Sequence, residues 1–448
     1  MHKTSRHKMG NWYASSRVSE QHVMQSAATL HILLTAASTL GFVDVNIPFA
    51  TAVFLCASMF FLDRTIYFLF PGLILMTLGF LSPLILSDAP VALKSPPNGA
   101  EYDRDMIISF YWFIGIFSFY VPAANAVQTW RIHDTRVGKS DLVPLLSAMI
   151  LLVFSALMLQ NGTLFTGGYR DVTEQRFGFI EFASLATLVG FCAARSRVAR
   201  NILIVAVAVY LATTFLAGLR LRFISVATVL FCCTVGTRIH SGWKIAGMLS
   251  AIMLFLLGRV RNAGFVGISL SDAFSFQNMY IQGTLVSTSG GAFQTSKFHA
   301  YYVKYIASEN GLNGLHFLIG DILSIFLTRG GLPDALEIKA QTSRFFDVPG
   351  GGLLPGYFYA YLGIGGAIVL SALFTMVFIF VLRRRHGEAF PYQVILAAYA
   401  PRMLLYDWTV AFKMMFYFLI LKLILSFLAN ASQAETNPRH LPTQRSWP

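Results

Sequence analysis

Long apolar runs are the feature of this sequence that most constrains its fold. Of the 448 residues, 55% are hydrophobic and only 12% are charged, whereas a soluble domain carries about 25% charged residues. A helix needs about 20 mainly apolar residues to cross the hydrocarbon core of a bilayer. The sequence therefore predicts an all-α polytopic membrane protein with about 12 transmembrane helices. The predicted spans are 23–43, 46–62, 65–86, 106–129, 142–160, 177–194, 201–217, 221–237, 245–258, 355–381, 391–407 and 410–429.

Lysine and arginine in the loops predict how these helices are oriented. The formal net charge is +13, and basic residues recur in both tails and in alternate loops. Basic loops stay on the cytoplasmic side of a membrane, so we expect the tails 1–22 and 430–448 to be cytoplasmic. This orientation accounts for the positive charge, and no nucleic-acid partner is expected.

The cysteines and the short motifs give no sign of a metal or a cofactor. All 4 cysteines lie inside apolar runs, where they lack metal-ligand spacing and form no disulfide framework. The sequence contains no HExxH or Walker motif. We therefore predict no metal site and no cofactor.

The longest stretch without a full span is 259–354, which the orientation places on the outer face. We predict a single integral membrane domain, 1–448, in which 259–354 forms one large ordered loop. The segment 312–327 is apolar, but at about 1.5 Å per residue it is too short to cross the membrane comfortably. We expect it to form a helix packed on the outer face or partly re-entrant.

A second helix is predicted within the same loop. Four aromatic residues recur there with the i, i+3, i+4, i+7 spacing of one helical face, namely Phe298, Tyr301, Tyr302 and Tyr305. Lys297 and Lys304 lie beside them. This pattern predicts an amphipathic helix that lies at the membrane interface.

Arginines in the outward loops are the most informative candidates for a binding site, because such loops usually carry few basic residues. Arginine binds phosphate bidentately and keeps its charge at any relevant pH. We expect these side chains to bind a diphosphate group, although pairing with nearby acidic residues or lipid headgroups is the alternative. The candidates are Arg220, Arg222, Arg259, Arg261, Arg329 and Arg344.

Candidates for proton transfer and sugar binding lie in the same outward region. Glu181 lies near the outer end of its predicted span and can accept a proton from a sugar hydroxyl, unless it pairs with an arginine. His299 is a second candidate base, because histidine titrates near neutral pH. Tyr357 and Tyr359 follow a glycine-rich turn and can stack on sugar rings, unless they belong to an interfacial aromatic belt.

Two stretches resemble the bacterial O-antigen or oligosaccharide repeat-unit polymerases, the Wzy family. Ala217-Gly218-Leu219-Arg220 is similar to the family's Gly-Ser-Arg step, with leucine here in place of serine. The glycine- and proline-rich stretch 349–366 resembles the end of the family's large loop. A competing stretch, 299–314, resembles the histidine-containing loop of the related O-antigen ligases. The distance from this stretch to the next span favours the polymerase.

The resemblance implies a membrane glycosyltransferase of GT-C-like architecture in the bacterial inner membrane. Its substrate would be an undecaprenyl-diphosphate-linked oligosaccharide. The growing glycan would pass from its lipid diphosphate to a new lipid-linked unit on the periplasmic face, forming O-antigen or exopolysaccharide. Membrane lipid would surround the protein, and the chain-length regulator and flippase of the same pathway are expected partners. The alternatives are a ligase-type glycosyltransferase and a flippase or other transporter of lipid-linked oligosaccharides.

Overall fold

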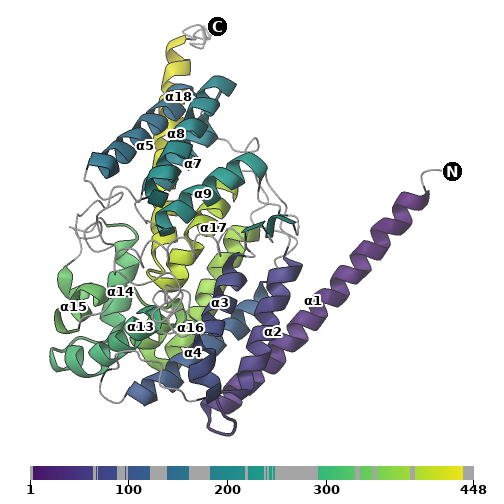
Figure 1. Ribbon diagram of the computed structural model, residues 1–448, viewed down its shortest axis with the longest axis vertical. Helices are drawn as coiled ribbons and strands as arrows, with labels where there is room; N and C mark the ends of the chain where they lie inside the picture. The colour runs from purple at the N-terminus through teal and green to yellow at the C-terminus, as the bar shows by residue number, and fades with distance from the viewer. Residues whose placement is uncertain are drawn as a thin grey trace, which may run out of the picture. The chain divides into compact units, whose positions relative to one another are not determined.

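The computed structural model shows an all-α protein whose described residues contain helices and no strand. The helices fall into two compact units, which are described separately below (Figure 1). The described residues are 4–63, 67, 69–87, 96, 99–121, 139–160, 182–216, 220–236, 239, 242–244, 246–247, 291–327, 333–346, 351–383 and 389–436.

The first unit is built around the long helix α16, which packs most extensively on α4. Aromatic rings fill this contact, because Phe70 stacks on Phe117 and Phe374 while Phe378 packs against all three. The helices of this unit are α1 (Thr4–Thr39), α2 (Ile47–Leu62), α3 (Leu69–Ser87), α4 (Gly99–Tyr120), α13 (Gly291–Tyr301), η6 (Tyr302–Ala307), α14 (Gly314–Ser324), η7 (Asp334–Leu336), α15 (Ile338–Phe345) and α16 (Leu354–Arg383).

The second unit contains α5 (Leu142–Gln160), α7 (Ala183–Ala193), α8 (Arg197–Leu216) and α9 (Arg220–Val235). Within it, α5 packs on both α7 and α8. Helices α17 (Phe390–Leu405) and α18 (Val410–Thr436) belong mostly to this unit. The end of α17 and the turn 406–409 that follows it belong to the first unit.

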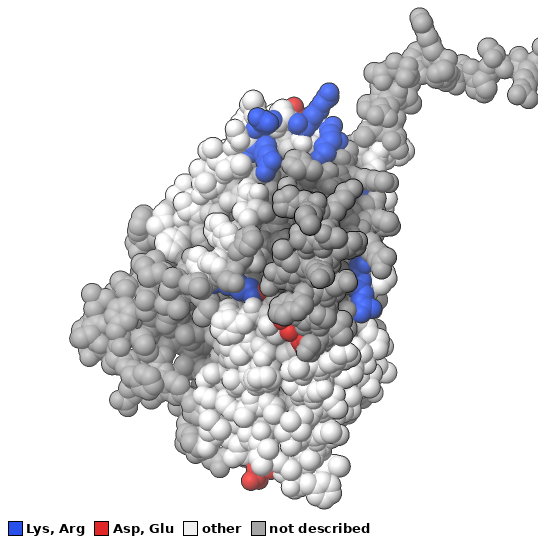
Figure 2. Space-filling model, turned by 90° about the vertical axis from the view of Figure 1, so that its right-hand side faces the viewer, with Lys and Arg blue, Asp and Glu red and all other residues white. Residues whose placement is uncertain are grey.

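Four described helices are long and apolar enough to cross a membrane, and they include α16 and α18. Their apolar segments are Leu142–Leu159, Arg197–Leu216, Leu354–Arg383 and Val410–Leu428. Several other described helices are apolar but shorter. On the face drawn in Figure 2, most of the described surface carries neither acidic nor basic side chains. The protein is therefore a membrane protein with apolar helices, as the sequence predicts.

The described part of the loop 259–354 forms a layer of short helices, α13 to α15, that packs on α16 and α4. The aromatic spacing around Phe298 lies on α13 and η6, but the predicted interfacial face is wrong in part, since Phe298 and Tyr302 are buried. Lys297 is also buried, with 2% of its side chain exposed, because its ammonium pairs with Asp103 of α4 at 2.6 Å.

Helix α16 is broken near its first third. Leu362 leaves the helical conformation (φ −140°, ψ 19°), and Gly363 has φ 67° and ψ −158°. Residues with a side chain rarely adopt a positive φ, so glycine accommodates the break at little cost. The break separates residues 354–361, which contact the loop layer, from the long apolar remainder of the helix.

Two glycines allow α14 to approach its neighbours closely. A Cβ atom at Gly314 would overlap the carbonyl oxygen of Tyr361, and a Cβ atom at Gly320 would overlap that of Leu336. Backbone carbonyls cannot move aside as flexible side chains do. These two contacts therefore fix α14 against α16 and against η7.

We expect Gly320→Ala to lower the free energy of unfolding by about 1–3 kcal/mol, the usual cost of overpacking. Gly365→Ala is the matched control, because a Cβ atom there meets nothing within 4 Å and alanine favours the helix. Thermal unfolding of the purified protein in detergent measures both effects. Equal melting temperatures for the two variants would contradict the close contact of α14 with η7.

Candidate functional site

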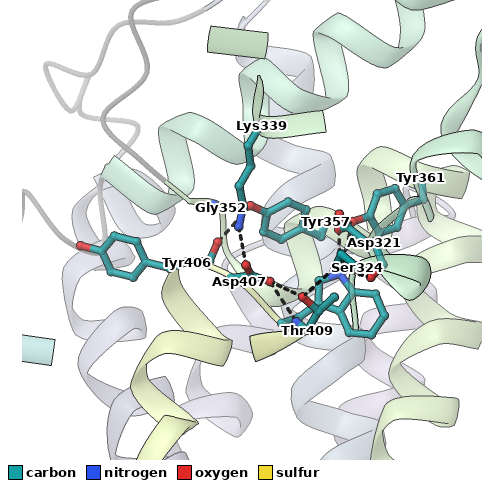
Figure 3. Close-up of polar contacts among 10 residues, drawn as sticks. Asp321, Ser324, Lys339, Gly352, Tyr357, Tyr361, Tyr406, Asp407 and Thr409 are labelled. Carbon is teal, nitrogen blue, oxygen red and sulfur yellow. Dashed lines mark hydrogen bonds and ion pairs between the residues drawn. The ribbon is translucent and has the colours of Figure 1, made fainter. Parts of the chain in front are cut away.

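A cluster of ionisable and aromatic side chains lies in the first unit, where the loop layer meets α16 and the turn 406–409 (Figure 3). We call it the loop cluster. It consists of Asp321 from α14, Lys339 from α15, Tyr361 from α16, and Asp407 and Trp408 from the turn. Each of these side chains except that of Tyr361 is partly exposed.

Asp321 is the carboxyl group around which the aromatic members of the cluster are arranged. One of its oxygens, Oδ2, accepts hydrogen bonds from the hydroxyl of Tyr361 and from Nε1 of Trp408, the latter at 3.2 Å. Burial, and then the negative charge of Asp407, raise the pKa of Asp321 to about 6. Asp321 can therefore gain and lose a proton near neutral pH, which is the property that a general base requires.

Lys339 and Asp407 form an ion pair beside this carboxyl group. Their charged atoms, Nζ and Oδ2, are 2.9 Å apart. Burial alone would raise the pKa of Asp407, but the charge of Lys339 outweighs it and holds that pKa well below its ordinary value. Desolvation would lower the pKa of Lys339, but Asp407 keeps it above its ordinary value. Both partners are consequently charged at neutral pH.

The chain folds locally to hold Asp407 in this position. Its second oxygen, Oδ1, accepts hydrogen bonds from the backbone N–H of Thr409 at 3.0 Å and from the Thr409 hydroxyl at 2.7 Å. A carboxylate that binds the backbone N–H two residues later forms an Asx turn. This turn joins α17 to α18 and fixes Trp408 between Asp407 and Thr409.

Tyr357 supports the cluster from within the core. Its hydroxyl donates to the carbonyl oxygen of Tyr406 at 3.0 Å and accepts from the backbone N–H of Gly352 at 3.1 Å. The ammonium of Lys339 lies 5.6 Å from the centre of its ring. Because the Tyr357 side chain has no exposed surface, it cannot stack on a sugar ring in this conformation.

Tyr359, the other tyrosine predicted to bind glycan, is half-buried. Its hydroxyl donates to Oδ2 of Asp105 on α4 at 2.5 Å. The hydrogen bond turns the polar end of this side chain toward α4, and Tyr359 is not part of the loop cluster. Its predicted role in sugar binding stays a prediction.

His299, one of the two predicted bases, lies behind the cluster and is completely buried. Its Nδ1 is 2.9 Å from the hydroxyl of Thr342, and its ring centre is 5.2 Å from that of Tyr357. Burial, and then the charge of Lys339, lower the pKa of His299 to about 3. A neutral and inaccessible ring can position α13 against α15, but it does not meet substrate in this conformation. Asp321, which is partly exposed, is therefore better placed than His299 to act as a base.

The predicted arginines are only partly described. Arg222 lies on α9 in the second unit, half-buried, and its Nη1 atom is buried with no hydrogen-bond partner. Arg220 begins α9, but its side chain is outside the described part of the structure. Arg344 is exposed on α15 and pairs with Asp334 at 3.0 Å. Glu181, Arg259, Arg261 and Arg329 lie outside the described residues.

One residue of the loop cluster, Asp321, stands out in the sequence, but its spacing does not reveal its partners. Asp321 is a single acidic residue in an apolar stretch, and such residues are costly unless they have a function or a partner. Asp407 pairs with Lys339, which is 68 residues earlier in the chain. Among the described residues, no three of the types His, Cys, Asp and Glu gather as a metal site would require.

Comparison of this chain with protein-family models, curated protein sequences and solved structures finds no match. A function must therefore be inferred from the chemistry of the loop cluster and from the membrane helices. A carboxyl group that titrates near pH 6, held by an indole and a phenol beside a fixed ion pair, can accept a proton from a hydroxyl group.

Proposed function

We propose that this protein is a membrane glycosyltransferase that polymerises undecaprenyl-diphosphate-linked oligosaccharide units on the outer face of the bacterial inner membrane. The proposal includes about 12 transmembrane helices, a GT-C-like architecture, cytoplasmic tails, and a chain-length regulator and a flippase as partners. Its sequence basis is the resemblance of 217–220 and 349–366 to the Wzy polymerases.

The observation that carries the proposal is Asp321, whose raised pKa and aromatic neighbours suit a base that acts on a sugar hydroxyl. In the proposed step, the carboxylate accepts the proton of an acceptor hydroxyl while the hydroxyl oxygen bonds to the anomeric carbon of the donor glycan. The bond from that carbon to the diphosphate oxygen breaks, and undecaprenyl diphosphate leaves with the electron pair. The donor is already activated, so the step requires no nucleotide.

Arg222 is the described residue best suited to bind the diphosphate, because its Nη1 atom is buried without a hydrogen-bond partner. A guanidinium group paired with a phosphate would satisfy this donor.

Purified protein in detergent, supplied with one defined lipid-diphosphate-linked unit, tests the reaction. We expect glycans of increasing length, with one lipid diphosphate released for each new linkage. A ligase would not elongate this single substrate, and a transporter would leave it unchanged because detergent offers no second compartment. Folded protein that releases no lipid diphosphate would contradict the proposed reaction.

A transporter is the second candidate because α16 is broken beside the cluster. Transporters often place ionisable residues next to interrupted membrane helices, and the break at Leu362 and Gly363 directly follows Tyr361. Cells that lack the gene discriminate the two functions. Loss of the polymerase leaves single units attached to their acceptor, whereas loss of a flippase removes even the single unit from the outer face.

We expect Arg222→Ala to raise the KM for the lipid-linked unit by about 10–100-fold, which corresponds to the loss of one charge-assisted hydrogen bond. Arg222→Lys should restore part of the affinity, because lysine keeps the charge without the bidentate geometry. Arg197, an exposed arginine of the same unit, provides the control Arg197→Ala. Initial rates at varied substrate concentration measure all three, and an unchanged KM in Arg222→Ala would exclude this residue from substrate binding.

A further inference from the structure

We propose that α14 is embedded along its length in the outer leaflet of the bilayer, with one face in contact with lipid acyl chains. The contact is made by an apolar stripe that we define as Leu315, Ile319, Ile322, Leu323 and Phe326. The inference concerns the position of α14 and holds whether or not the protein is a glycosyltransferase.

The stripe lies along one face of α14 and extends into the turn that follows the helix. Its members recur at i, i+4, i+7, i+8 and i+11, and they cover an arc of about 100° at 100° per residue. Their side chains are 39–54% exposed. No member of the stripe is polar or charged, so nothing on this face suits contact with water.

The opposite face of α14 packs against protein. Gly314, Phe317, Leu318 and Gly320 are buried, and the close contacts of the two glycines hold the helix on Tyr361 and Leu336. Asp321 lies on this inner side and bonds to Tyr361 and Trp408. The exposed stripe is therefore the side of a firmly seated helix that faces away from the unit.

The break in α16 indicates where the bilayer surface lies. The remainder of the helix, 364–383, has about 20 residues and is about 30 Å long, which is the thickness of the hydrocarbon core. It ends at Arg383, and two more arginines follow in the sequence, as expected at the other surface. The break therefore lies near the outer surface of the membrane, and Gly314 contacts α16 at Tyr361, directly beside it.

Helix α16 also exposes apolar side chains, as a helix in contact with lipid would. Leu362, at the break, is exposed, as are Val369, Leu373 and Phe380 on the spanning part. Helix α14 has 11 residues and reaches only about 16 Å, which is too short to cross the core. An amphipathic helix at this depth buries its apolar face among acyl chains and keeps its other face on the protein.

Site-directed spin labelling in lipid nanodiscs tests this position. A nitroxide on Ile319→Cys should collide more often with oxygen than with a water-soluble nickel chelate, as should a label on Val369→Cys. A label on Ser343→Cys, at an exposed site of α15, should show the reverse. The four native cysteines are buried thiols, so labelling of the folded protein is selective, and the measurement requires no enzymatic activity.

Each outcome decides the proposal. An oxygen preference at residue 319 that matches residue 369, together with quenching of a fluorophore at 319 by brominated lipids, supports contact with acyl chains. Access to the nickel chelate equal to that at residue 343 would place the stripe in water and overturn the proposal. Protection from both reagents with dipolar broadening between labels would instead show that a second copy covers the stripe, which also overturns it.

Discussion

Replacing Asp321 with asparagine should lower the rate of polymer formation by about 10²–10⁴-fold, the usual contribution of a positioned general base. Asparagine retains an oxygen that accepts hydrogen bonds from Tyr361 and Trp408, but it cannot take up the proton. The rate of lipid diphosphate release by the purified variant measures the effect. Because the variant keeps the hydrogen bonds that hold this side chain, the loss should appear in kcat more than in KM.

The same substitution should leave the protein at least as stable as the wild type at pH 7. The pKa of Asp321 is raised in the folded state, so its contribution to stability is full below the unfolded pKa and is lost as pH rises through about 6. Asparagine never carries the buried charge. Asp334→Asn, at an exposed carboxylate of the same loop, is the control and should keep full activity. An active Asp321→Asn variant would remove Asp321 from the proposed reaction.

Substitutions in the Lys339–Asp407 pair should move the pH dependence of the reaction in opposite directions. A base must be deprotonated, so the wild-type rate should rise with pH through about 6 and then level off. Lys339→Met removes a positive charge that favours the ionised form of Asp321, and the rise should move to higher pH. Asp407→Asn removes a negative charge that opposes ionisation, and the rise should move to lower pH.

Each of these single substitutions should also lower the free energy of unfolding by about 1–3 kcal/mol, because it leaves a half-buried charge without its partner. The double variant should lose less than the sum of the two, since the partners are in direct contact. Rate profiles between pH 4.5 and 8, at roughly half-unit steps across the titration range of histidine and shifted carboxylates, measure the first effect. Shifts in the same direction for both variants would show that the pair does not set the protonation of Asp321.

The helices were largely predictable from the sequence, whereas their surroundings were not. The predicted spans 355–381 and 410–429 correspond to α16 and the apolar part of α18, because hydropathy over about 20 residues is a local property. The predicted span 106–129 misses the start of α4, which begins at Gly99. Acidic residues open that helix, and their partners lie far along the chain, in the loop layer and on α16.

The loop cluster could not be predicted for the same reason. Its members come from four segments, and nothing local in the sequence indicates that Lys339 pairs with Asp407 or that Tyr361 binds Asp321. The spacing around Phe298 correctly predicted a helix, but the burial of Lys297 depends on a carboxylate almost two hundred residues earlier in the chain. A helical period reports which residues share a face, and tertiary contacts decide what that face meets.

The pairing of α4 with the loop layer also has a consequence for biogenesis. Glu101, Asp103 and Asp105 at the start of α4 bond to Lys304, Lys297 and Tyr359, residues that the ribosome adds much later. A nascent chain that has formed α4 therefore carries three acidic side chains without these partners until α13 and α16 have been made. The contact of α4 with the loop layer is thus completed late in synthesis, and a chain truncated before α13 would lack all three of these partners.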